Sequence, residues 1–233
     1  HPPGQRRHEQ VEQVEADGEP QRGRLRELAR EQRHLGRASS RPVLLPGALV
    51  QLAHVAGCEV TGVVGASHKV ATLEGLGVEH IIDKSSADLW ARAKAIAPSG
   101  YDVICDANGV ATLKDSYRHL ARAGKLVVYG FHTMIPKRGG KPNWLKLIAG
   151  VLRTPRFSPL DMTTKSVSVL AFNLSYLFDR LDILTEGVGR LFGWLEEGVI
   201  RPAEVTAFAL DDVADAHRLI ESGQSVGKLV LIP

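Results

Sequence analysis

Long apolar runs and clustered cysteines are both missing from this chain of 233 residues. The apolar run LIAGVL, residues 147–152, is far shorter than the roughly 18 residues that a membrane-spanning helix needs. The opening HPPGQRRHEQ has no apolar core of the kind that a secretory signal carries. The two cysteines, Cys58 and Cys105, have no Cys or His neighbour at metal-ligand spacing. We therefore expect a cytoplasmic protein without a disulfide framework.

An excess of one charge is also missing. The formal net charge is +3 and the isoelectric point is about 8.9, without a concentrated basic stripe, so a nucleic-acid partner is not expected. The chain has nine histidines, but they are scattered, and no spacing would place three of them on one metal ion. The sequence therefore predicts no metal site.

Lysine is absent before Lys69, although arginine is frequent there. Residues 1–41 are rich in Arg, Glu, Gln and His and have few aromatic or β-branched side chains, so they cannot bury enough apolar surface to order themselves. We expect an atypical segment over 1–41, either disordered or not native to the protein. A functional basic tail is the alternative interpretation.

From Pro42 onward, helical patterns alternate with short β-branched runs, as in βαβ units. Runs such as DVIC and LVVYG are apolar throughout, which is typical of strands covered on both faces in a parallel sheet. The fold class predicted is α/β, a Rossmann-like doubly wound parallel sheet. Helices are expected at 47–56, 67–76, 87–96, 112–124 and from 180 to a turn at Gly198, and strands at 58–64, 78–83, 101–107, 125–130, 169–177 and 228–233.

The segment ahead of the first expected helix departs from this pattern. RASSRPVLL stands where such a fold has its first strand and a glycine-rich loop, and only Gly47 remains of the loop. The sequence therefore predicts a sheet that lacks its usual first strand. We expect a dinucleotide-binding domain over 42–175 and a C-terminal segment, 176–233, that returns toward a catalytic domain.

Ligands of doubly wound sheets bind outside the carboxyl ends of the strands, so the residues after each apolar run are candidates. No acid ends the strand at 58–64, which favours a 2′-phosphate over two free ribose hydroxyls and hence NADP over NAD. For Ser67 and Lys69 a helix cap and a solvated side chain are the alternatives. For Asn108, Gly130 and Asn173 a plain turn or strand end is the alternative. The candidate cofactor-binding residues are Gly47, Gly65, Ala66, Ser67, Lys69, Lys84, Asn108, Gly130, Phe172, Asn173 and Leu174.

Several stretches in order along the chain carry a family resemblance. They include GALVQLAHVAGCEVTGVVG, LGVEHIID, YDVICDANG, LARAGKLVVYG and AHRLIESGQSVGKLVLIP. From about residue 46 to the end, the chain resembles the cofactor-binding half of the medium-chain dehydrogenase/reductase superfamily, in its zinc-independent quinone-oxidoreductase branch. Residues 136–177 are most similar to the group that contains the vesicle amine transport protein homologue.

The resemblance implies an NADP(H)-dependent oxidoreductase that reduces quinones or α,β-unsaturated carbonyls without a catalytic side chain or a metal. It places Lys69 on the 2′-phosphate, with Gly65 and Ala66 against the adenosine ribose, and Lys84 where relatives often carry Tyr. It places Gly130 and the main chain of 172–174 beside the nicotinamide. The N-terminal domain of the family has no counterpart in the first 40 residues, so we expect a truncated chain with impaired activity.

A non-catalytic function is the alternative. KPNWLKLIAGVLRTPRF, residues 141–157, combines apolar and basic side chains and could lie on an anionic membrane or a partner. An ordinary helix that packs on the substrate cleft or a dimer surface is the other interpretation of this segment, because Pro142 and Pro155 bound it. The final strand, KLVLIP, presents an apolar edge and predicts a homo-oligomer.

Overall fold

The structure is a computed structural model that describes residues 41–46, 49–131, 148, 150 and 152–233. Its main body is a six-stranded sheet with the order β3-β2-β1-β4-β5-β6, in which every pair is parallel. This is the doubly wound order of a dinucleotide-binding fold, so the predicted fold class is confirmed. The six strands are β1 Arg41–Pro46, β2 Cys58–Val64, β3 His80–Asp83, β4 Tyr101–Asp106, β5 Leu120–Val128 and β6 Ser168–Ala171.

Helices connect these strands and cover both faces of the sheet. One face packs beneath α3 and α4 around Val50 and Leu73, and the other packs beneath α5 and α6 around Ala93 and Leu113. From β1 to β2 and β3 the chain moves toward one edge of the sheet, and from β4 to β5 and β6 it moves toward the other edge. Because such crossovers share one hand, the helices of the two halves lie on opposite faces. The connecting helices are α3 Val50–Val55, α4 Val70–Glu74, α5 Leu89–Ile96, α6 Leu113–Arg118 and α8 Pro159–Lys165.

The prediction that the first strand is missing was wrong. Arg41–Pro46 forms β1, which lies at the centre of the sheet and pairs with β2 along its whole length. Val43 and Leu45 point into one core and Leu44 into the other. Two prolines flank this short apolar run, and because proline is usually excluded from central strands, the pattern resembled a loop. Here the prolines occupy the second and the last positions of the strand.

Other elements differ from the expected boundaries. The helix expected at 112–124 ends at Arg118, and residues 120–124 belong to β5, whose pairing with β4 shifts register between Tyr101 and Val103. The strand expected at 169–177 ends at Ala171 and is followed by a 3₁₀ turn, Leu174–Tyr176. Gly57 follows α3 with φ +70°, the left-handed conformation in which many helices end.

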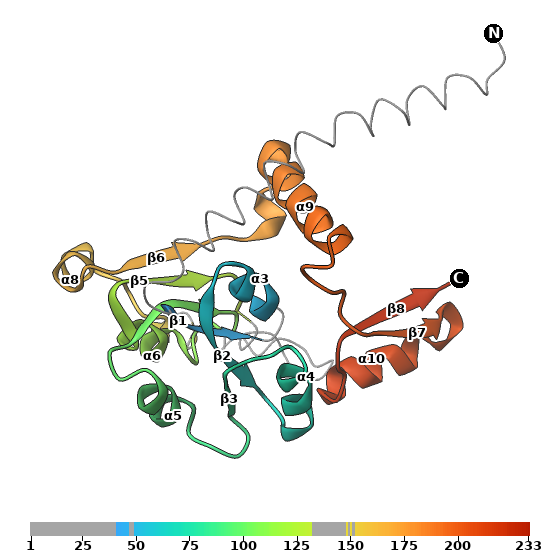
Figure 1. Cartoon of the computed structure of the whole chain (residues 1–233), viewed down its shortest axis with the longest axis horizontal. Coiled ribbons are helices and arrows are strands. Elements are labelled where there is room, and N and C mark those ends of the chain that lie inside the picture. The colour runs from blue at the N-terminus through green and yellow to red at the C-terminus, as the bar shows by residue number, and fades with distance from the viewer. Residues whose placement is uncertain (1–40, 47–48, 132–147, 149, 151) are drawn as a thin grey trace, which may run out of the picture.

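The C-terminal residues form an arm beside the sheet (Figure 1). It begins with α9 Leu181–Glu196, which matches the expected long helix, and Gly198 follows it with φ +67°. The strand β7 Val205–Ala209, which the sequence analysis did not predict, pairs in parallel with β8 Lys228–Ile232, and α10 Val213–Ser222 connects them. Three apolar residues of β8, Val230, Leu231 and Ile232, are exposed. Oligomerisation through this strand stays a prediction.

The junction between β4 and α6 is held by a buried carboxylate. Asp106, the last residue of β4, is only 3% exposed. It accepts hydrogen bonds from the backbone N–H groups of Asn108 and Gly109 at 2.9 and 3.0 Å, and from the hydroxyls of Thr112 and Ser116 at 2.7 Å each. Four donors therefore fix the turn that leads from the sheet into α6.

Leu44→Ala tests the central position of β1. The side chain of Leu44 is 4% exposed, so its truncation should lower the free energy of unfolding by about 2–5 kcal/mol. Leu160→Ala is the matched control, because Leu160 is 78% exposed and should change stability little. Urea unfolding monitored by circular dichroism measures both. Equal midpoints for the two variants would contradict a buried central β1.

Asp106→Ala tests the carboxylate at the β4–α6 junction. The change leaves two backbone N–H groups and two hydroxyls without their acceptor, and each unsatisfied buried donor costs about 1–3 kcal/mol. Thermal unfolding should show a large loss for this variant. Asp102→Ala, on the same strand, is the control. A melting temperature as high as that of the control would show that Asp106 does not hold the junction.

Candidate functional site

The strand order of the sheet reverses direction between β1 and β4, and this switch point is where ligands bind in open α/β sheets. A cavity of about 140 Å³ lies there, at the carboxyl ends of β1, β2 and β4. Leu44, Val63 and Ile104 contribute apolar side chains to its wall, and Trp90 of α5 lies beside them. Ligand pockets usually have about 300–1,000 Å³. The cavity can therefore enclose only part of a dinucleotide, such as one ring.

The polar part of the cavity wall comes from residues that follow the strands. Lys84 stands directly after β3, and Asn108 stands two residues after β4. Thr112, which precedes α6, and Ser116 of α6 also line the cavity, but their hydroxyls donate to Asp106. Lys84 thus supplies the positive charge at this cavity, and none of the described carboxylates lies within ion-pair distance of it.

The ends of β2 and β3 meet at one corner of the site. Val64 is opposite Asp83 in the register, and the N–H of Lys84 donates to the carbonyl of Val64 at 3.1 Å. A side chain at position 65 would meet only the Cε atom of Lys84, at 3.5 Å, so the surface of Gly65 is otherwise open. A flat group can therefore approach the end of β2 closely.

Asp83 adds a negative charge at this corner, which the sequence analysis did not anticipate. It accepts the hydroxyls of Ser67 and Ser85, at 2.5 Å each, and the N–H of Ser85 at 2.8 Å. The hydrogen bonds from Ser67 and Ser85 lower the pKa of Asp83 to about 2, so it stays ionised at neutral pH. The hydroxyl of Ser67 is consequently engaged by protein, and it forms no side-chain cap on its own 3₁₀ turn, Ser67–Lys69.

A thiol and a phenol, both half-buried, lie close to Asp106 in the sequence or the sheet. Cys105 lines the cavity, and burial raises its pKa to about 11. Burial also raises the pKa of Tyr129 to about 12, with smaller contributions from Cys105 and Asp106. Both groups therefore remain protonated at neutral pH, and Cys105 adds no charge to the cavity wall.

The candidate residues on the far side of the site sit after β5 and β6. A side chain at Gly130 would lie 2.9 Å from the carbonyl oxygen of Ala107, so glycine lets the two strand ends approach each other. Phe172 follows β6, donates its N–H to Val128 and stacks on Tyr129 with ring centroids 6.3 Å apart. Asn173 accepts the N–H of Ser175 at 3.0 Å, which matches the turn alternative for this residue.

The structure therefore brings together only part of the predicted set. Gly65, Lys84 and Asn108 line the cavity at the switch point. Ala66, Ser67 and Lys69 follow Gly65 along the chain at the same strand end, and Gly130 borders Ala107, which lines the cavity. The segment 172–174 is exposed and does not line this cavity. Gly47 lies outside the described residues, as does most of the basic apolar segment 141–157.

Several residues of the site were not among the candidates, and Asp83, Trp90, Cys105 and Asp106 are examples. The spacing D-x-x-G-x-x-T-x-x-x-S from Asp106 to Ser116 is the signal that could have identified the Asp106 network, since three of the four donors to its carboxylate belong to that pattern. The Asp83 contact with Ser67 spans 16 residues and depends on the register of β2 and β3. No local pattern predicts it.

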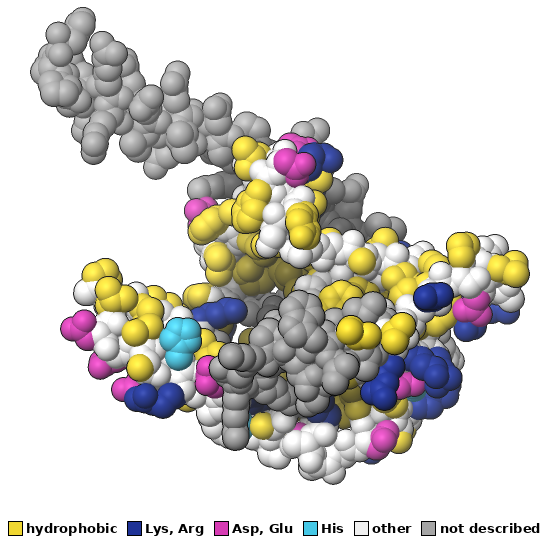
Figure 2. Space-filling model, turned by 180° about the vertical axis from the view of Figure 1, so that it is seen from behind, with side chains coloured by type: hydrophobic (Ala, Val, Ile, Leu, Met, Phe, Trp, Pro, Cys, Tyr) yellow, Lys and Arg dark blue, Asp and Glu magenta, His cyan; other side chains and the backbone are white. Residues whose placement is uncertain are grey.

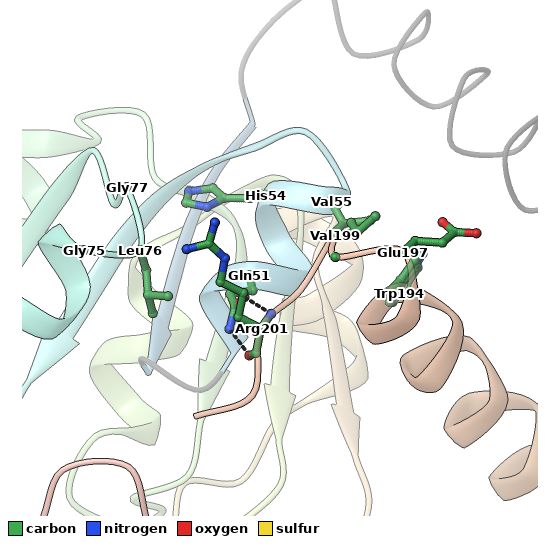
Figure 3. A pocket seen from close by; sticks show the side chains of 11 residues that line it. Gln51, His54, Val55, Gly75, Leu76, Gly77, Trp194, Glu197, Val199 and Arg201 are labelled. Atoms are coloured by element: carbon green, nitrogen blue, oxygen red, sulfur yellow. Dashed lines mark hydrogen bonds between the residues drawn. The ribbon is translucent and has the colours of Figure 1, made fainter. Parts of the chain in front are cut away.

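A second cavity, of about 610 Å³, lies where the C-terminal arm meets α3 (Figure 3). The amide of Gln51 donates to the carbonyl of Arg201 at 2.9 Å and accepts its N–H at 2.7 Å. The side chain of Arg201 extends toward His54, while Glu197 points away (Figure 3). Trp194 of α9 contributes an apolar wall. None of the predicted cofactor residues lines this cavity.

The residues that the structure describes also bear on metal binding and on membrane insertion. In that part of the chain, no three His, Cys, Asp or Glu side chains are arranged to hold a metal ion. Within the same residues, no helix has both the length and the apolar character that crossing a bilayer requires.

Comparisons with known proteins agree with this architecture. The profile of a family described as zinc-binding dehydrogenase matches residues 76–231. The chain is 30% identical over 187 residues to the human synaptic vesicle membrane protein VAT-1 homolog, which covers 80% of this chain and 47% of that protein. It is 26% identical over 182 residues to a probable quinone oxidoreductase of Leishmania amazonensis, covering 77% and 51%.

A solved mycobacterial structure in complex with NADPH has the same fold, with a TM-score of 0.63 and 21% identity, over 84% of this chain and 59% of that one. The chain spans about half the length of the curated relatives it matches. Since the family profile covers more than half of its residues, the chain belongs to the zinc-binding dehydrogenase family and, with it, to the quinone oxidoreductase-like members of the medium-chain dehydrogenase/reductase superfamily.

Proposed function

We propose that this chain provides the NADP(H)-binding part of an oxidoreductase that transfers hydride to quinones or α,β-unsaturated carbonyls. The observation that carries the proposal is the cavity at the switch point, lined by Gly65, Lys84 and Asn108. Family membership supports the reaction class. Relatives named quinone oxidoreductase and prostaglandin reductase, together with a structural neighbour that holds NADPH, support the cofactor.

The described residues fit the adenosine half of NADP(H). The open face of Gly65 admits a ribose, and the ammonium group of Lys84 stands beside it. Lys69 adds a second cation at the end of the turn that follows β2. Asp83 is the one carboxylate at this corner, and its oxygens already accept several protein donors. Two cations against one engaged carboxylate favour a 2′-phosphate over free ribose hydroxyls.

Bound NADPH would supply the hydride, so the protein's part is to bind, orient and exclude water. Leu44, Val63 and Ile104 give the cavity a dry wall. Asp106 holds the β4–α6 turn in place and thereby positions Asn108. Cys105 is protonated at neutral pH and adds no charge to the wall. We assign no catalytic side chain and no metal ligand.

For the 233-residue chain on its own we propose weak binding and slow turnover. Only residues 47–49 connect β1 to α3, and Gly47 is the single glycine among them. A glycine-rich connection presents several backbone N–H groups to a pyrophosphate, and a shorter one presents fewer. Charge-assisted hydrogen bonds contribute about 1.5–3 kcal/mol each, so the loss of a few lowers affinity by several powers of ten.

An NADPH titration tests the proposed cofactor. Adding NADPH to the purified chain should give saturable enhancement of nicotinamide fluorescence, with weak affinity. NADH should bind more weakly still, because it lacks the 2′-phosphate that Lys69 and Lys84 attract. A linear fluorescence response up to the solubility limit of NADPH would refute cofactor binding by this chain.

Lys69→Ala and Lys84→Ala test the assignment of the phosphate contact. Each substitution removes one charge-assisted contact and should raise the Kd for NADPH about tenfold to a hundredfold, with NADH binding unchanged. Lys228→Ala, an exposed lysine on β8, is the control and should leave both affinities unchanged. If a variant weakens NADH and NADPH binding equally, its lysine does not contact the 2′-phosphate.

A further inference from the structure

A second charged hollow lies on the opposite face of α6 from the nucleotide cavity. Its volume is about 390 Å³, and it is formed by α6, α8 and the segment that precedes α8. Thr112 and Ser116 face the nucleotide cavity, whereas Lys114, Tyr117 and Arg118 line this hollow. We call it the basic groove. Its lining residues are Lys114, Tyr117, Arg118, Arg153, Pro155, Arg156, Phe157, Asp161 and Lys165.

Side chains of α6 and α8 contact each other at the floor of the basic groove. The hydroxyl of Tyr117 donates to Asp161 at 2.8 Å, and Lys165 pairs with the same carboxylate oxygen at 3.1 Å. The rings of Tyr117 and Phe157 pack with centroids 5.1 Å apart, and the Nζ atom of Lys165 lies 4.9 Å from the centre of the Tyr117 ring. These contacts connect α6 to α8 across the floor of the groove.

Positive charge is in excess around this floor. Five cationic side chains and a single carboxylate line the groove, and Lys165 already neutralises that carboxylate. Arg118 has a distant partner in Asp115, at 3.4 Å. Among the described residues, Lys114, Arg153 and Arg156 have no carboxylate within ion-pair distance. Burial and the bond to Asp161 raise the pKa of Tyr117 to about 12, so its hydroxyl adds no negative charge.

The gathering of cations is local. The whole chain carries a formal net charge of only +3, yet Lys and Arg side chains cluster at the right of the view in Figure 2, near α8. Like charges held around one hollow repel each other, and a bound anion relieves that repulsion. The planar guanidinium group of arginine can also donate two parallel hydrogen bonds to the oxygens of a phosphate.

We propose that the basic groove binds a soluble small molecule that carries a pyrophosphate group. Cations stand on both walls, Lys114 and Arg118 on α6 and Arg153 and Arg156 opposite, so two linked phosphates engage more of them than one phosphate does. The volume lies within the range of about 300–1,000 Å³ that is usual for small ligands, and a hollow fits a compact anion better than a flat lipid surface. This site is separate from the proposed NADP(H) site.

Calorimetric titration with inorganic pyrophosphate at low salt tests the proposal. The double variant Arg153→Gln/Arg156→Gln should raise the Kd for pyrophosphate about tenfold or more. The control Arg180→Gln/Arg190→Gln removes the same charge from exposed sites around α9 and should leave the Kd unchanged. Circular dichroism establishes that both variants fold. An equal effect of the two double variants would overturn the proposal, because pyrophosphate would then respond to net charge alone.

Two further measurements distinguish binding in the basic groove from binding at other anion sites. Lys84→Gln, at the nucleotide cavity, should leave pyrophosphate binding intact, and loss of binding in that variant would place the anion in the wrong site. Sedimentation with phosphatidylserine vesicles should depend little on Arg153 and Arg156. Vesicle binding that requires both arginines, in a chain that gives no heat with pyrophosphate, would overturn the soluble ligand in favour of a membrane surface.

Discussion

β1 lies between β2 and β4, and its parallel hydrogen bonds to both are the constraint on which the rest of the structure depends. The side chains of three of its residues pack into the two cores, Leu44 on one face of the sheet and Val43 and Leu45 on the other. The strand also creates the point at which the sheet changes direction. Without it, the ends of β2 and β4 would not flank one cavity, and Gly65 and Asn108 would not share a wall.

Much of the fold could be predicted because apolar strand runs alternate with helical patterns along the chain, even though the connecting helices are short. The parallel arrangement followed from burial on both faces. The central strand was missed because Pro42 and Pro46 bound a very short run, and proline removes backbone donors that a ladder normally uses. β7 was missed for a different reason. Its run VTAFA is only five residues long and includes two alanines, which have little preference for strands.

The candidate site was predictable only where the chemistry follows directly from a strand end. Gly65 and Asn108 could be named because each follows an apolar run, and Lys84 could be named from its position in the family resemblance. The bond from Ser67 to Asp83 could not, because it depends on which residues of β2 and β3 lie opposite each other. This contact changes the chemistry of the corner. An ionised carboxylate shares this corner with Lys84, so the local charge is set by more than one residue.

The paired hydrogen bonds between Gln51 and the main chain of Arg201 connect residues 150 positions apart. Ile200, next to Arg201, is only 8% exposed. Releasing the arm would therefore break both hydrogen bonds and also expose the Ile200 side chain to water. Separation of the arm from α3 therefore carries both costs at once. Amide groups on either side of this contact should exchange with solvent together, and the start of the arm should behave as part of the body that contains the six-stranded sheet, not as a freely jointed tail.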